Sequence, residues 1–443
     1  MSPITALAAR GPDTPPLWRP PPRPGEPAWL ATRRREATGW VEEHGFPTIK
    51  HEDWRYTRLE ALLEVPFEPA PGDVLLPEVA GKFGGHLGGP RLVLVNGQLI
   101  AELSEGRDLP AGTRIGSLGV ALSEGHRPLE RLWAPPPGGY AHAFRALSDA
   151  LAIDGAFIAL PARAAMDLPI EVVYVTVGTE QPVLASPRLV VLAGPGSRAT
   201  IVESFHGAGP GPGLTNALTQ VVLGEGASID HYKVQAEDVG AFHMSSLEVQ
   251  PARASCFRSC LLALGACLGR HEVVAHLEAE QATVQLDGLF LPTGTQHHDN
   301  PVLVDHAAPK CTSHQLFKGI VSDRASGVFN GHVVVRPGAA GTDAHQVNKN
   351  LLLSEQAQVY TRPRLEIFAD EVACTHGAAV GQLDEDALFY LRSRGIPERA
   401  ARALLIGGFA EELLDRWPAG PLQDYARELV AARLGAGDQP VRP

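Results

Sequence analysis

GVFNGHVVV (residues 327–335) and QVNKNLLL (residues 346–353) are two neighbouring runs with the alternating polar and apolar pattern of β-strands. Alternation places every second residue on one face, so each run carries its own row of polar side chains. The first row is Val328, Asn330, His332 and Val334, and the second is Gln346, Asn348 and Asn350. Like residues stack between successive turns of a β-helix, and such rows therefore favour one. A sandwich or a barrel remains compatible with periodicity alone.

The strand pattern extends well beyond these two runs. From about residue 168 to 380 the chain consists of short segments rich in Val, Ile and Leu, separated by Gly, Pro and Asp. Long helical patterns are absent there, which argues against a sheet built from strand–helix–strand units. No strict repeat is visible, only a loose recurrence of strand, turn and strand. The predicted fold class is therefore mainly β, with a β-helix core over residues 150–380.

Both ends of the chain have a different composition. Residues 1–27 are rich in Pro and Arg and are expected to be disordered. Residues 28–65 predict a small helical N-terminal domain, which mixed elements could extend to about residue 150. Residues 381–435 predict a helical C-terminal domain that begins with Asp384 as an N-cap and has Gly395 after its first helix. Gly407 and Gly408 are expected to interrupt the second helix of this domain, and residues 436–443 form a tail.

Composition excludes several classes of protein. The formal net charge is −12, which disfavours binding to nucleic acid or to an anionic membrane. The five cysteines are odd in number and irregular in spacing, so they do not form a disulfide framework. No apolar run is long enough to span a membrane, and no secretion signal is visible. These features predict a soluble protein of the reducing cytoplasm.

The pair Cys374 and His376 is the strongest candidate for chemistry. The two residues lie two apart at the end of a strand-like run, so their side chains should project to one face. A thiol and an imidazole together suit metal or sulfur chemistry. The spacing alone favours the other interpretation, a small buried cysteine beside a hydrogen-bonded histidine.

The remaining cysteines and histidines form no recognisable site. Cys256, Cys260, Cys267 and Cys311 lack the spacing of a zinc or ferredoxin site, and structural cysteines are the preferred interpretation. Six histidines crowd a short part of the sequence without the spacing of a facial triad or an HExxH helix, and hydrogen-bonded strand and turn histidines are expected. They are His297, His298, His306, His314, His332 and His345.

Motifs for nucleotide hydrolysis are also absent. The chain has no Walker-type phosphate loop, no dinucleotide fingerprint between a strand and a helix, and no GxSxG elbow. Any ATP-driven step must therefore be performed by another chain, and the protein is not expected to be an enzyme.

The run from residue 296 to 396 resembles the C-terminal core of the SufB/SufD family, the scaffold proteins of iron–sulfur cluster assembly in the SUF system. The resemblance is carried by QHHDNPVLVDHAAPKCTSHQLFKGIVSDRASGVFNGHVVV, DAHQVNKNLLLS, RPRLEIFADEVACTHGAAVGQLDEDALFYLRSRGI and IGGFAEELL. The Cys-x-His-Gly motif and the sequence after it favour the SufD branch over the SufB branch. Thr375 and Ala379 stand where Ser and Thr are frequent in relatives, and neither change removes a ligand.

This resemblance implies a right-handed parallel β-helix flanked by helical domains. It further implies a heterodimer with SufB and attachment of the ATPase SufC through the C-terminal helices, with a homodimer possible for the isolated chain. His376 would lie at the interface and face a SufB cysteine, with Cys374 beside it. A nascent iron–sulfur cluster would be held there transiently before transfer to apoproteins. No tightly bound cofactor is implied, although reduced flavin is associated with some complexes of the family.

Two other classes of protein are compatible with a β-helix. A polysaccharide-acting enzyme would need convergent carboxylates along a groove and usually a secretion signal. A purely structural homodimer would leave Cys374 and His376 as inert core residues.

Overall fold

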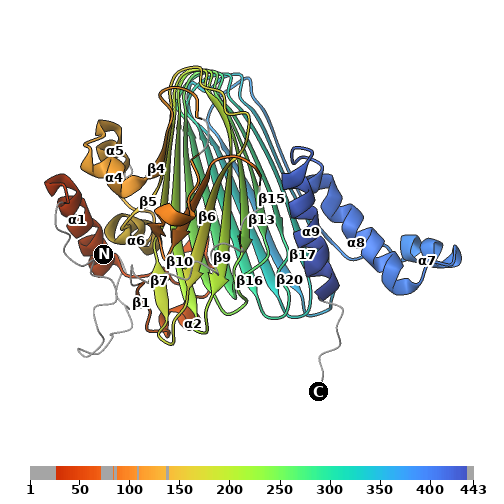
Figure 1. The fold of residues 1–443 in the computed structure, drawn as a ribbon. Coiled ribbons are helices and arrows are strands. Elements are labelled where there is room, and N and C mark those ends of the chain that lie inside the picture. Colours follow the sequence, from red (N-terminus) through yellow and green to blue (C-terminus); the bar gives the residue numbers. More distant parts are fainter. Residues whose placement is uncertain (1–25, 71–82, 84–86, 107–108, 136–138, 437–443) are drawn as a thin grey trace.

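The computed structural model describes residues 26–70, 83, 87–106, 109–135 and 139–436, and its centre is a parallel β-helix (Figure 1). Of the segments predicted to be disordered (residues 1–27) or a tail (residues 436–443), residues 1–25 and 437–443 lie outside the described residues. Two sheets form the walls, and from β8 to β19 each strand pairs with the strand two further along the chain. The predicted parallel β-helix core with helices at both ends is confirmed.

Sheet A contains eleven strands, most of them parallel. Their bounds are β1 (Glu68–Pro69), β4 (Arg114–Ser117), β5 (Gly155–Leu160), β7 (Val183–Ala185), β8 (Arg188–Ala193), β10 (Gly213–Leu223), β12 (Phe242–Pro251), β14 (Leu268–Leu277), β16 (His297–His306), β18 (Ser326–Val335) and β20 (Gln358–Ile367).

Sheet B contains ten strands and faces sheet A across the interior. Its strands are β2 (Arg91–Val95), β3 (Gln98–Leu99), β6 (Ile170–Val177), β9 (Arg198–Ala208), β11 (Ser228–Ala236), β13 (Cys256–Ala263), β15 (Thr283–Phe290), β17 (Thr312–Val321), β19 (Asp343–Leu352) and β21 (Ala373–Gly381).

One left-handed backbone position recurs at a corner of successive coils. Its φ angle lies between 53° and 73° at Arg163, Gly196, Gly226, Ala254, Gln281, Lys310, Gly341 and Glu371. The amide of each of the first seven donates to a carbonyl of the next coil, at 2.8 to 3.2 Å. Only three of these residues are glycine, and the spacing between corners varies. The strict repeat is therefore in the backbone geometry, and the sequence shows only a loose one.

The inward positions of the strands form the hydrophobic core. Residues such as Ile201, Val249, Val284 and Phe329 are almost fully buried in one continuous cluster. In the first of the two runs described above, Val328 and Asn330 belong to the outward row, whereas Phe329 points into this core. Alternation along the strands therefore decides which side chains fill the interior.

Most of the N-terminal helices cover the early coils on the outside of sheet A, and one short 3-10 helix packs against β2 of sheet B. They are α1 (Ala28–His44), the short 3-10 helix η1 (Glu52–Trp54), α2 (Glu60–Leu63), the 3-10 helix η2 (Ala101–Leu103), α4 (Leu118–Ser123), α5 (Arg127–Leu132) and α6 (Ala143–Leu151). Every residue of α6 is buried, because this helix lies between α1 and the sheet.

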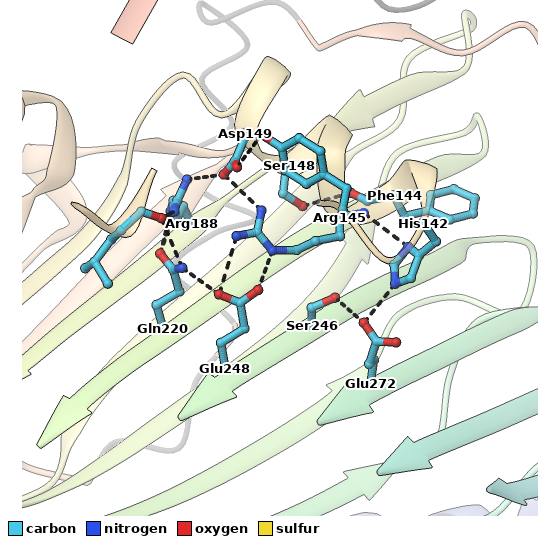
Figure 2. Close-up of polar contacts among 12 residues, drawn as sticks. His142, Phe144, Arg145, Ser148, Asp149, Arg188, Gln220, Ser246, Glu248 and Glu272 are labelled. Atoms are coloured by element: carbon cyan, nitrogen blue, oxygen red, sulfur yellow. Dashed lines mark hydrogen bonds and ion pairs between the residues drawn. The ribbon is translucent and has the colours of Figure 1, made fainter. Parts of the chain in front are cut away.

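A buried polar network joins α6 to four strands of sheet A (Figure 2). Asp149 accepts from Arg188 of β8 at 2.8 Å and forms an ion pair with Arg145 at 3.0 Å. Arg145 in turn pairs with Glu248 of β12, and Gln220 of β10 donates to the same carboxylate at 2.6 Å. Charges removed from water in this way must be paired, so the network fixes one register of helix on sheet.

The C-terminal helices are α7 (Glu385–Ser393), α8 (Glu398–Leu414) and α9 (Pro421–Ala436). The expected interruption at Gly407 and Gly408 is wrong, because α8 runs through both glycines. Ile406, Ala410 and Leu413 of this helix are buried in a cluster with the outer face of sheet B. That packing outweighs the low helix propensity of the two glycines.

The network in Figure 2 generates a prediction about stability. Arg188→Met should lower the free energy of unfolding by about 3 kcal/mol, because Asp149 loses a partner at a fully buried position. Arg253→Met is the matched control, since it breaks an exposed ion pair with Glu225 and should cost less than about 0.5 kcal/mol. Urea unfolding followed by circular dichroism measures both. Equal midpoints for the two variants would show that the network does not stabilise the fold.

Candidate functional site at the last coil

The last coil of the β-helix consists of β20 and β21, and one edge of each strand is unpaired. β20 pairs with β18, and β21 pairs with β19; no other strand in the described part of the chain pairs with either. Almost every residue of β21 is exposed, in contrast to the buried strands of earlier coils. The β-helix is therefore open at this end.

The strand register places Cys374 and His376 on the inward face of β21. Their partners on β19 are Ala344 and Gln346, which are 1% and 0% exposed. The predicted common orientation of the thiol and the imidazole follows from this pairing. Because no further coil covers β21, these inward positions are at the open end, and His376 is exposed.

Cys374 is the more protected of the two. It packs against a small apolar cluster that includes Val335 and Ala344. Partial burial, together with the charge of Asp343, raises the pKa of the Cys374 thiol. The free chain therefore holds this sulfur mostly as a thiol at neutral pH, and a nearby cation or metal ion would be needed to favour the thiolate.

Apolar side chains are also exposed on the last coil. Ile367 is 43% exposed, Phe368 is 60% exposed and Val380 is 46% exposed. The inward partner of Ile367 in the previous coil, Val335, is fully buried. The last coil thus presents core-type residues to solvent, which is typical of a surface that binds another protein.

The N-terminal region holds the outer face of β20 in place. Arg362 donates to Glu52 at 2.5 Å, and Arg364 donates to Asp53 at 3.1 Å. The ring of Tyr360 stacks on Tyr56 with centroids 4.3 Å apart. These contacts join the beginning of the chain to its last coil.

The other candidate histidines are distributed over several strands and are held by local contacts. His298 bonds to the carbonyl of Gly265 at 2.8 Å, and burial lowers its pKa to about 3, so its ring is neutral. His306 lies 2.8 Å from Ser313, and burial lowers its pKa to about 4. The rest contact neighbouring side chains: His297 with Ser326, His332 with Glu366, and His314 with His345, which also bonds to Thr375.

The other four cysteines are free thiols on separate elements. Cys260 accepts from the indole of Trp417 at 3.0 Å, under the C-terminal helices. Cys267 and Cys311 donate to backbone carbonyls, and Cys256 lies outside the core. Burial raises the pKa of all four thiols, which suits a structural role.

A complete metal site is not formed by the described residues alone, since no group of three or more His, Cys, Asp or Glu side chains is arranged to hold an ion. Cys374 and His376 together offer one sulfur and one nitrogen donor. A tetrahedral centre needs four ligands. The pair can therefore contribute to a site only if a second molecule supplies the other donors.

The C-terminal helices carry a second exposed apolar surface. Phe389 and Tyr390 of α7 are 72% and 57% exposed, and Leu404 of α8 is 57% exposed. Figure 1 shows α7 and the start of α8 extending away from the β-helix. Sequence reasoning missed these three residues individually, although the adjacent aromatic pair on a short amphipathic helix could have indicated them.

No helix among the described residues combines the length and apolarity needed to cross a bilayer.

The raised pKa of Cys374 generates a prediction about reactivity. At pH 7.5, iodoacetamide should alkylate Cys374 more slowly than free glutathione, because less of its sulfur is thiolate. It should still react before Cys260 and Cys311, which are buried. Peptide mass spectrometry after timed quenching gives the rates, with Cys374→Ser as the control that removes the signal. A rate equal to or above that of glutathione would contradict a raised pKa of the Cys374 thiol.

Comparison with known proteins agrees with this geometry. Two family models match, described as "SUF system FeS cluster assembly, SufBD core domain" over residues 175–409 and "SufBD protein N-terminal region" over residues 24–172. A SufBD family protein of Synechocystis is 32% identical over 418 residues, covering 92% of each chain. SufD of Escherichia coli is 31% identical, covering 89% of this chain and 90% of the relative, and SufD of Bacillus subtilis is 26% identical, covering 92% and 93%.

The core match alone spans more than half of the chain, and two relatives above 30% identity extend over nearly all of it. The chain belongs to the SufBD family of iron–sulfur cluster assembly proteins.

Proposed function

We propose that this chain is the SufD-type scaffold subunit of a SUF complex. It pairs with SufB through its last coil, binds the ATPase SufC through α7 and α8, and takes part in building a nascent iron–sulfur cluster for transfer to apoproteins. The observation that carries this proposal is the open last coil, where Cys374 and His376 face inward on a strand with one unpaired edge. The proposed complex works in the cytoplasm, where thiols stay reduced.

The unpaired edges of β20 and β21 support pairing with another β-helix. Their free backbone groups can continue both ladders into a partner strand. Burial of Ile367, Phe368 and Val380 would add apolar contact area at the same place. A second copy of this chain could occupy the same edge when SufB is absent, and we propose that homodimer as the state of the isolated chain.

The donor atoms suit a shared cluster site. Iron–sulfur clusters are bound by cysteine thiolates, and imidazole also binds iron. His376 and Cys374 would lie on one molecule and the remaining ligands on SufB. The site would then form when the two subunits pair and be lost when they separate. The cluster is cargo on this account, and we assign no resident cofactor to this chain; a reduced flavin would belong to the assembled complex.

A contact between α8 and sheet B could couple ATPase binding to the site. Glu412 of α8 bonds to Lys318 of β17 at 2.7 Å and to Lys349 of β19 at 3.0 Å. The hydrogen bond with Lys318 lowers the pKa of Glu412 to about 2, so the carboxylate is ionised at neutral pH. Lys349 is the register partner of Ala379 on β21. Movement of α8 by a bound ATPase would therefore reach the strand that carries His376 through one intervening strand.

The role of His376 can be tested in cells. His376→Ala should reduce activity of an iron–sulfur reporter enzyme at least about tenfold, as loss of a metal ligand or its support does. Co-purification with SufB and SufC should be unchanged, because the imidazole is exposed and makes little of the contact area. His314→Ala, on the outer face of β17, is the control and should retain activity. Normal reporter activity in the His376 variant would refute a direct role.

The docking surface can be tested with purified SufC. Phe389→Ser combined with Leu404→Ser should weaken binding by about 2 kcal/mol or more, because exposed anchors of this type carry much of an interface. This variant is sharper than deletion from Asp384 onward, which would also strip α8 and α9 from sheet B. Ile49→Ser is the control for loss of an exposed apolar residue elsewhere. Unchanged affinity in calorimetry would reject the assignment of α7 and α8.

A further inference from the structure

A row of polar side chains leads from the interior of the β-helix to His376. Gln315, Gln346 and His376 are successive register partners on β17, β19 and β21. The two glutamines are 3% and 0% exposed, and the amide of Gln346 donates to the carbonyl oxygen of Gln315 at 3.0 Å. The stacked row of amides thus ends at the imidazole of the last coil.

The side-chain amide of Gln346 is hydrogen-bonded through its nitrogen, and its oxygen is unpaired in the described part of the chain. Its nitrogen is bonded to Gln315, whereas its oxygen Oε1 accepts no hydrogen bond from any described residue. An unpaired buried carbonyl oxygen is unfavourable, and a donor that reaches it stabilises the structure. Because the nitrogen is directed toward the previous coil, the oxygen is directed away from it, and the next residue in the row is His376.

The opposite wall is shaped to hold this amide. A Cβ atom added to Gly331 of β18 would lie 2.0 Å from Nε2 of Gln346, so the amide approaches the backbone of the opposite sheet closely. Gly331 and Gln346 come from different sheets, and their close approach fixes the amide between the walls. A side chain held by a neighbour at its nitrogen and by backbone across the interior has little freedom to rotate.

We propose that Gln346 is a positioning residue for His376: the exposed imidazole turns toward the row of amides, and one ring N–H of His376 then donates to the free Oε1 of Gln346. The bond fixes which ring nitrogen carries the proton, and the lone pair of the other nitrogen is then presented to the neighbouring subunit. Metal-binding histidines generally need such a second partner to set tautomer and orientation. The inference rests on the proposed function for its purpose, although the hydrogen bond itself can be measured in the isolated chain.

A neutral acceptor suits this task. A carboxylate at the same place would favour the doubly protonated ring, which has no lone pair for iron. The amide oxygen accepts a hydrogen bond without adding charge. The imidazole therefore stays neutral and can act as a ligand.

The experiment is nitrogen NMR on the isolated full chain labelled with ¹⁵N in its histidine rings. The signals of His376 are identified by their loss in His376→Gln, and spectra are recorded at a pH where the ring is neutral. In the unmodified chain the two ring nitrogens should have well-separated shifts, the signature of one dominant tautomer. In Gln346→Met the separation should fall to about half or less, because both tautomers become populated.

Three further variants make the result specific. Asn348→Leu removes a buried amide whose register partner is Ala378, and it should leave the His376 signals unchanged. Gln346→Glu places a carboxylate there and should bring the two ring shifts together, as in the doubly protonated ring. Gln315→Met releases the amide nitrogen of Gln346 and should reduce the separation partly, which gives a second route if Gln346→Met does not fold.

The inference is overturned if the His376 shifts are the same in Gln346→Met or Gln315→Met as in the unmodified chain, or if Asn348→Leu changes them equally. These outcomes leave the proposed function standing, because that depends on the loss of cluster formation in His376→Ala. Conversely, normal cluster formation in His376→Ala with a clear tautomer change in Gln346→Met would keep the hydrogen bond and reject its proposed purpose.

Discussion

The backbone of the last coil has hydrogen-bonding groups that the described chain does not pair. At the first end, antiparallel strands β3 and β4 close the two sheets. At the last end, β20 and β21 each pair on one side only. An unpaired strand edge with exposed core-type residues such as Ile367 and Val380 tends to pair with another chain. The exposed position of Cys374 and His376 follows from this one constraint, since inward residues are left at an open end when no coil covers them.

Segments from both helical ends contact the strands near this open edge. In the N-terminal region, Glu52 and Asp53 form ion pairs with the outer face of β20. In α8, Glu412 accepts a hydrogen bond from sheet B. Both contacts lie within one or two strands of β21. In the proposed function, the chain presents Cys374 and His376 at the interface with a partner, and the partner supplies the remaining ligands.

Local patterns in the sequence predicted much of the fold and part of the site. Asp384 caps α7 by accepting from the amides of Asp386 and Ala387, and Gly395 takes the left-handed conformation after that helix, as predicted. The common face of Cys374 and His376 also follows from strand alternation. The network around Arg188 and the free oxygen of Gln346 could not be predicted, because they depend on contacts between residues far apart in the chain. The continuous α8 shows that packing can override a local signal.

Hydrogen–deuterium exchange on the strands of the last coil tests the central claim most directly. With SufB added, peptides covering residues 358–381 should gain strong protection, because the free amides of β20 and β21 become paired, while strands β9 to β13 should keep their exchange rates. Unchanged exchange over residues 358–381, with protection elsewhere on the molecule, would show that the open end is not the interface with SufB and that His376 does not face a partner.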